Sequence, residues 1–176
     1  MLNLANLDAA TRAQMVAEIS ADVDARRLYL SNRLSVAGAQ EYPRLLREAA
    51  ERSNDGWLAN ELRQPGRLNE MEERRKPKGG TTMVRVPVTA PETLAEGEFN
   101  RFYIRGLCLR SIAEGIEELT IYRAKEVDNP RPGSEAKIGE RISAQALLAD
   151  LRANVGVDTA LGLPPGPNSG LSVRLP

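Results

Sequence analysis

Residues 98–114, EFNRFYIRGLCLRSIAE, decide the fold. Their apolar side chains recur at helical spacing, which predicts one helix from about Glu98 to Glu114 with Gly115 at its C-terminal stop. The apolar positions cover most of the helix circumference, and they are Phe99, Phe102, Tyr103, Gly106, Leu107, Leu109 and Ala113. A helix that is apolar on so many sides is buried in a core. We therefore expect this helix at the centre of the domain.

Strands are predicted on both sides of this helix. Val84, Val86 and Val88 recur with a period of two, which is typical of a strand, and Pro87 places that strand at a sheet edge. Residues 119–124 are predicted as a second strand. The result is a β-α-β unit, whose crossover is right-handed if the two strands are parallel neighbours. Because two strands and one helix bury too little apolar surface alone, either the N-terminal helices or another chain must cover the unit.

The N-terminal region, residues 1–64, is predicted to be a helical hairpin or small bundle. A first helix is expected over residues 7–35, capped by Asp8. A second helix is expected to start at Pro43, since the fixed φ of proline suits a first helical turn. Residues 53–56 indicate a break before a short further helix that contains Trp57. Residues 65–81 are charged and bracketed by Pro and Gly, so they are interpreted as a linker or mobile loop.

The small α/β core domain is predicted to end at residue 154. Residues 128–133 form a turn-rich loop, and Ser143 is expected to cap a helix that runs to about Asn154. Residues 155–176 are rich in Gly and Pro, which favours an extended tail. The tail ends in apolar residues, so it is expected to lie in a groove or to add a strand to a neighbouring chain, with a frayed terminus as the alternative. The predicted interface residues there are Leu171, Val173, Arg174 and Leu175. The fold class is therefore α+β.

The composition excludes several classes of protein. The 176 residues include no histidine, which removes Ser-His-Asp and Cys-His catalytic pairs and every zinc site that needs imidazole. Cys108 is the only cysteine, so no disulfide forms within one chain and a reducing site of synthesis fits best. The 24 basic and 24 acidic residues give a net charge of zero, which argues against non-specific electrostatic binding to nucleic acid. No apolar run approaches the roughly 18–20 residues that span a bilayer, so neither secretion nor a membrane contact is expected.

The residues that could suggest catalysis or metal binding are better explained by structural roles. Ser134 and Lys137 match an S-x-x-K spacing, but the motifs that accompany it in serine acyltransferases are absent, and Ser134 is expected to cap a helical turn. Cys108 lies in the apolar helix, where a thiol behaves as a small hydrophobe. Two carboxylate pairs, Asp22 with Asp24 and Glu117 with Glu118, are spaced so that they do not converge on a metal. We therefore predict no catalytic residue, no cofactor, no metal and no small-molecule substrate.

Two groups of basic residues are candidate contact sites. Arg101 and Arg105 lie four residues apart on the apolar helix, and a buried guanidinium needs an anionic partner. The alternatives are an internal ion pair, for which Glu98, Glu114 or Glu118 are available, a pair with another subunit, or a phosphate. In the charged segment, Arg74, Arg75, Lys76 and Lys78 are candidates for phosphate contacts, although Glu70, Glu72 and Glu73 weaken the local field.

Two segments resemble uncharacterised proteins encoded by tailed bacteriophages. They are residues 97–108, GEFNRFYIRGLC, and residues 166–176, GPNSGLSVRLP. The resemblance implies a virion part, either a capsid-associated protein or a component of the head-to-tail junction, made in the cytoplasm of the host bacterium. We therefore expect a non-enzymatic structural protein that binds other virion proteins and copies of itself through its core domain and tail. The alternatives are an accessory protein that binds nucleic acid through residues 74–78 and the helix arginines, and a small enzyme that uses Ser134 and Lys137.

Overall fold

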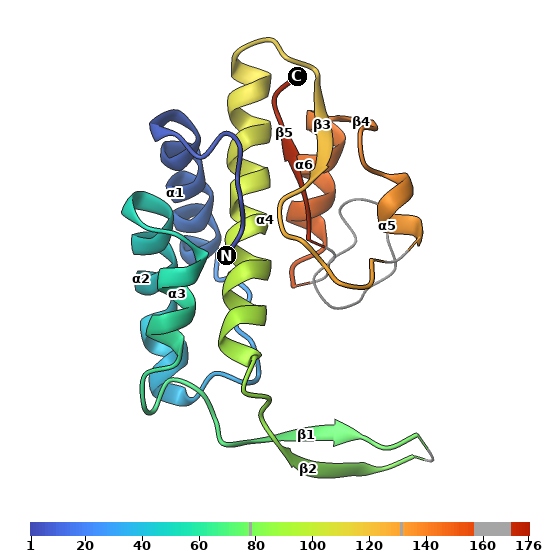
Figure 1. The fold of residues 1–176 in the computed structure, drawn as a ribbon. Helices are drawn as coiled ribbons and strands as arrows, with labels where there is room; N and C mark the ends of the chain where they lie inside the picture. Colours follow the sequence, from blue (N-terminus) through green and yellow to red (C-terminus); the bar gives the residue numbers. More distant parts are fainter. Residues whose placement is uncertain (78, 131, 157–169) are drawn as a thin grey trace.

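The computed structural model describes residues 1–77, 79–130, 132–156 and 170–176. A long central helix separates a layer of three helices from a small sheet with its own helices, which confirms the α+β class (Figure 1). The helices are α1 (Ala9–Asp24), α2 (Val36–Arg52), α3 (Asp55–Leu62), α4 (Ala90–Ala113), α5 (Pro132–Ala136) and α6 (Ala144–Ala153). The strands are β1 (Met71–Arg75), β2 (Thr81–Arg85), β3 (Glu118–Arg123), β4 (Arg141–Ser143) and β5 (Leu171–Arg174).

The central helix α4 is the helix that the apolar spacing predicts. It begins at Ala90 rather than Glu98, because Pro91 stands in its first turn, where a missing N–H costs nothing. Phe99, Phe102 and Leu107 are completely or almost completely buried, so the predicted place of the helix in the core is confirmed. Gly115 follows the last turn with a φ of 75°, which also confirms the predicted stop.

Helix α1 packs closely on α4 at Gly106. A Cβ atom built on Gly106 would lie 2.9 Å from the backbone nitrogen of Met15 and 3.0 Å from the carbonyl oxygen of Thr11. Such distances are shorter than any normal carbon contact, so the two backbones approach this closely only because residue 106 has no side chain. The N-terminal helices thus cover α4, which is one of the two ways in which its apolar surface was expected to be buried.

The predicted bounds of the first two helices are wrong. Asp8 caps α1 as predicted, but the helix ends at Asp24 because Arg26 adopts a φ of 55° and the Arg27 N–H donates to the Asp22 carbonyl at 2.8 Å. Helix α2 begins at Val36 rather than Pro43, since the Ser35 hydroxyl accepts a hydrogen bond from the Gly38 N–H at 2.9 Å. The break at residues 53–56 and the short helix α3 are confirmed.

The predicted β-α-β unit does not form. Strand β2 pairs antiparallel with β1, whereas β3 lies between β4 and β5 in a separate antiparallel sheet. Helix α4 has 24 residues and so spans about 36 Å at 1.5 Å per residue. It therefore carries the chain to the opposite end of the molecule, where β3 begins (Figure 1). The segment predicted as a linker or mobile loop, residues 65–81, contains strand β1, which pairs with β2.

In the C-terminal third, the structure agrees more closely with the predictions from the sequence. Ser143 caps α6 by accepting a hydrogen bond from the Ala146 N–H at 3.4 Å, and Leu147, Leu148 and Leu151 are buried, as predicted. Strand β5 occupies the second edge of β3, so the end of the tail adds a strand to its own sheet. Residues 157–169 of the predicted tail lie outside the described residues.

Candidate interaction surface

The two arginines predicted at an interface lie inside the chain. Arg105 is 1% exposed and Arg101 is 7% exposed. The Arg105 guanidinium donates to Glu18 at 2.7 Å and to both carboxylate oxygens of Asp22 at 2.5 and 3.1 Å. Arg101 donates to Glu98 at 3.3 Å. Among the alternatives that the sequence left open, the structure contains the internal ion pairs, although the partners of Arg105 come from α1 and not from α4.

These residues form a buried charge cluster at the junction of α1, α4 and α6. Arg152 from α6 joins it through two hydrogen bonds to Glu18, at 2.5 and 3.1 Å. Burial opposes ionisation of Glu18, but the hydrogen bonds from Arg152 and Arg105 outweigh it and hold the Glu18 pKa below its usual value. Burial raises the pKa of Glu98, which has Arg101 as its nearest cation. The cluster therefore ties three helices together.

The four predicted interface residues of the tail also contact their own chain. Leu171 is 2% exposed and Val173 is fully buried. The Tyr103 hydroxyl donates to the Val173 carbonyl at 3.1 Å, while Arg174 lies over the Tyr122 ring, 5.8 Å from its centroid. The Leu175 N–H donates to the side chain of Asn6 at 2.9 Å. The end of the tail thus completes the core and holds the N-terminal segment.

The residues considered for catalysis are not arranged for it. Ser134 is 2% exposed, and the Lys137 ammonium pairs with Glu140 at 3.0 Å. Burial raises the pKa of the Cys108 thiol to about 12, so this group is not a thiolate at neutral pH. In the described parts of the chain, no three acidic or thiol side chains gather in a way that would hold a metal ion.

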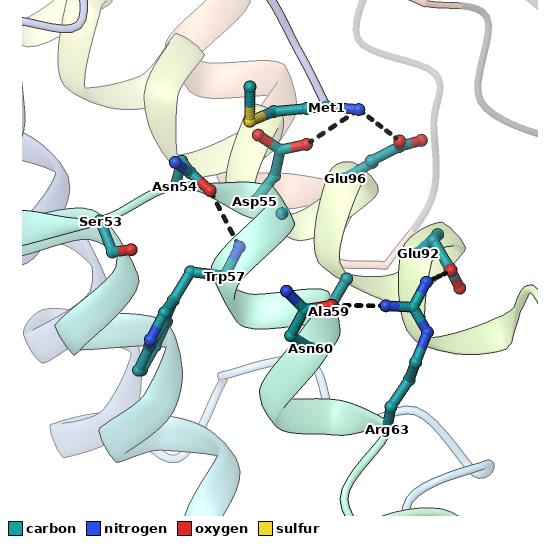
Figure 2. A pocket seen from close by; sticks show the side chains of 11 residues that line it. Met1, Ser53, Asn54, Asp55, Trp57, Ala59, Asn60, Arg63, Glu92 and Glu96 are labelled. Atoms are coloured by element: carbon teal, nitrogen blue, oxygen red, sulfur yellow. Dashed lines mark hydrogen bonds and ion pairs between the residues drawn. The ribbon is translucent and has the colours of Figure 1, made fainter.

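A pocket of about 570 Å³ lies between α3, the start of α4 and the N-terminal segment (Figure 2). Its charged groups are paired with one another. The Met1 amino group lies 3.5 Å from Glu96 and 3.8 Å from Asp55, and Arg63 pairs with Glu92. Glu96 also accepts from the Lys125 ammonium at 2.6 Å. The pocket therefore offers a ligand few groups that are not already paired.

The feature that projects from the body is the hairpin of β1 and β2. We call residues 70–86 the hairpin arm; it extends from the N-terminal end of α4, away from the helices (Figure 1). Gly79 and Gly80 adopt φ values of 91° and 76°, which the turn requires and which glycine adopts without strain. At its base, Arg33 pairs with Glu72 at 2.6 Å and the Asn69 side chain donates to the Leu34 carbonyl at 3.0 Å.

One face of the hairpin arm is fully exposed. The pairing of Met71 with Arg85, Glu73 with Met83 and Arg75 with Thr81 puts these six residues on the same face, and each of them is exposed. Met71 is 41% and Met83 58% exposed. Neither strand has extensive contacts with another described helix or strand. The arm therefore presents two methionines and two open strand edges to solvent.

The arm is basic toward its tip. Arg74, Arg75 and Lys76 follow one another and are exposed, whereas the charge of Glu72 is neutralised at the base by Arg33. Lys78, the fourth predicted phosphate contact, lies outside the described residues. The sequence reasoning placed these residues in a loop, although Gly79-Gly80 between a charged segment and Thr-Thr-Met-Val was a hairpin signal. The charged composition of β1 concealed this signal, since Glu is depleted in strands and β1 contains two of them, Glu72 and Glu73.

Comparison with known proteins does not indicate a family or a function for this chain. No protein-family model, no curated protein and no solved structure matches the chain. A search of the described helices for a membrane-spanning segment found none of sufficient length and apolarity.

Proposed function

We propose that this protein is a non-enzymatic structural component of a tailed-bacteriophage particle and that it docks on neighbouring virion proteins through the hairpin arm. The observation that carries the proposal is the placement of the arm, which stands away from the body with one face and both strand edges exposed. The other predicted contact residues, in α4 and in β5, are occupied within their own chain. The phage assignment itself rests on the resemblance of residues 97–108 and 166–176.

The arm has the physical properties of a docking element. An open strand edge carries unpaired N–H and C=O groups that another chain can bind by adding a strand. Methionine side chains are flexible and polarisable, so Met71 and Met83 adapt to an apolar partner surface. A two-stranded hairpin is marginally stable alone, and a partner that covers it would stabilise it.

The test is particle incorporation after replacement of residues 71–85 by a short Gly/Ser connection. Phage that lack the gene would be complemented with either this variant or a control, and particles would be purified by sedimentation and analysed for the protein. Arg52→Ser, which changes a solvated residue of α2, is the control. We expect the control in particles and the arm replacement only in the soluble fraction, with an unchanged circular dichroism spectrum for its helices. Normal incorporation of the folded arm replacement would refute the proposal.

The basic tip favours a second candidate function, an accessory contact with nucleic acid. A two-stranded ribbon fits the major groove of DNA, and three consecutive cations stand at the tip. If Arg74, Arg75 and Lys76 each neutralise one phosphate, log K against log salt concentration would have a slope of about −2.7. Binding of a duplex at low salt that is lost on R74S/R75S/K76S would support this function. No binding at low salt would exclude it.

A further inference from the structure

We propose that two copies of this chain pair through the free edge of β2, antiparallel about a two-fold axis at Met83, and so form a four-stranded sheet with the order β1-β2-β2-β1. The proposal rests on the proposed function in one respect, since it assigns a partner to the same hairpin arm. The partner is a second copy of this chain, the pairing strand is β2, and the register is centred on Met83. Three observations lead to it: the direction of the backbone groups of β2, the residues that the register places opposite one another, and the contrast with β1.

The hydrogen-bond pattern fixes which groups β2 offers. The Val86 N–H donates to the Glu70 carbonyl and the Lys76 N–H to the Gly80 carbonyl, both at 2.9 Å. In an antiparallel pair, hydrogen-bonded positions alternate with positions that are not hydrogen-bonded. Since 70–86 and 76–80 are hydrogen-bonded positions, the pairs 72–84 and 74–82 are as well. The backbone N–H and C=O groups of Thr81, Met83 and Arg85 therefore point away from β1, toward the open edge.

Among the symmetric registers open to a second copy of β2, the one centred on Met83 pairs the most residues, because Met83 is the middle residue of the strand. A two-fold axis perpendicular to a sheet places one residue opposite its own copy, and the outward groups of Met83 allow a hydrogen-bonded pair there. In this register Thr82 lies opposite Val84 of the second copy, and Thr81 lies opposite Arg85 of the second copy. The β-branched pair is favourable, and no two like charges stand opposite one another. The edge of β2 is therefore complementary to itself.

The same comparison favours the edge of β2 over the edge of β1 as the shared edge. Its outward backbone groups belong to Met71, Glu73 and Arg75, so its symmetric register is centred on Glu73. That register puts two Glu73 carboxylates directly opposite each other, which destabilises a strand pair. It also puts Glu72 opposite Arg74 of the second copy, but Glu72 is already paired with Arg33 at 2.6 Å and adds little attraction. Moving the axis to Met71 or Arg75 leaves fewer residues paired. The charge of β1 thus protects one edge, whereas β2 has no charged side chain at its centre.

Pairing through β2 also covers part of the exposed methionine surface. Met71 and Met83 lie on the same face of the hairpin, on neighbouring strands and two positions apart. In the four-stranded sheet, the Met83 side chains of the two copies meet at the axis and Met71 of each copy flanks them. The four side chains form one diagonal apolar stripe. Because five residues pair per strand, the association is weak in dilute solution and is favoured where a particle holds copies close together.

The decisive test is disulfide formation by the full-length Met83→Cys variant. Cα atoms of a hydrogen-bonded antiparallel pair lie about 5.5 Å apart, within the range of a disulfide. Cys108 is buried and does not compete. The matched control is Arg75→Cys, because Arg75 lies on the same exposed face, on β1, and its replacement keeps the Glu73 carboxylate that disfavours pairing through β1. We expect Met83→Cys to form a covalent dimer at least about tenfold faster than Arg75→Cys in air. Equal rates, a faster control or no dimer would overturn the proposal.

A second pair of variants tests the backbone contact without a thiol. The Met83 N–H is not used in the β1–β2 ladder, so Met83→Pro removes the central donor of the open edge and keeps the hairpin. Glu73→Pro does the same at the edge of β1. In sedimentation equilibrium at high protein concentration, we expect the wild type and Glu73→Pro to dimerise and Met83→Pro to remain monomeric. A Met83→Pro dimer of wild-type affinity would refute the pairing.

The outcome is separable from the test of function. If Met83→Cys does not cross-link while the arm replacement is still lost from particles, the arm docks on another protein and the β2 pairing is refuted. If Met83→Cys cross-links and the arm replacement enters particles normally, the pairing holds and the proposed function is refuted.

Discussion

Replacing Arg105 by methionine should destabilise the protein far more than replacing Arg110, on the same helix, by methionine. Arg105 is 1% exposed and makes three hydrogen bonds to two buried carboxylates. When Arg105 is removed, Glu18 keeps Arg152 at 2.5 Å. Asp22 then keeps Arg27, at 3.7 Å and with a side chain that is 58% exposed, and a weaker interaction with Arg152. The substitution therefore removes both hydrogen bonds that Arg105 donates to the buried Asp22 carboxylate.

The expected loss of unfolding free energy follows from the buried Asp22 carboxylate, which loses its main partner while Glu18 keeps Arg152. Breaking a buried ion pair by removing one partner costs about 3–5 kcal/mol, because the remaining charge stays out of water without compensation. The long apolar side chain of methionine fills most of the vacated volume, so the cavity adds little to this cost. A second substitution, Asp22→Leu, removes that buried charge. The double variant should therefore recover at least about 1 kcal/mol relative to the sum of the two single effects.

Urea unfolding, followed by circular dichroism and by the fluorescence of the single tryptophan, measures these free energies. Arg110→Met is the control, since Arg110 lies five residues further along the same helix and pairs with Asp8 and Glu114, which are both about half exposed. Its loss should not exceed about 1 kcal/mol. If Arg105→Met costs no more than Arg110→Met, the buried cluster does not hold α1 against α4 and the reasoning fails.

Three further predictions concern the tail, the thiol and pH. Leu171→Ala should lower the unfolding free energy by about 2–5 kcal/mol, whereas Leu30→Ala, at an exposed position, should change it by less than about 1 kcal/mol; denaturant titration compares them. Cys108, with a pKa of about 12, should react with a thiol reagent only after unfolding, and fast labelling of the native chain would contradict its burial. The folded pKa of Glu18 is lowered, so its stabilising effect is complete above its unfolded pKa of 4.5 and is lost as the pH falls through the folded value. Glu18→Gln should therefore be less stable than the wild type at neutral pH, and the difference should shrink as the pH falls below 4.5 and through the lowered folded pKa of Glu18.

Local sequence patterns correctly predicted those helices and strands that are determined by residues close together in the sequence. The apolar spacing of residues 98–114 placed α4 in the core, Gly115 marked its end, and Ser143 marked the start of α6. Each of these signals acts over about one helical turn, through a cap hydrogen bond or a buried stripe. The strand at residues 119–124 was predicted in the same way, from β-branched and aromatic side chains.

The partners of these elements could not be predicted, because they are far away in the sequence. Glu18 binds Arg105 across 87 positions, and neither residue carries a local sign of the other. Burial predicted that Arg105 needs an anionic partner, but it did not predict which residue or group supplies the negative charge. Sheet pairing failed for a similar reason. Strand β3 prefers β4 and β5 over β2 because the length of α4 separates the two ends of the molecule, which a strand-helix-strand pattern does not reveal.

The hairpin arm is also the part of the chain whose contacts matter least to the stability of the body, which supports the proposal that it carries the binding site. The body is held by a core shared among α1, α4, α6 and β5 and by the buried charge cluster, so a change at any of its contact residues alters folding and binding together. The arm is attached at its base by Arg33, Glu72 and Asn69, and most of its side chains are exposed. Substitutions along it remove little buried area and leave the body intact. A partner that pairs with β2 therefore supplies the contacts that an isolated ribbon lacks, and its binding energy is separable from the stability of the fold.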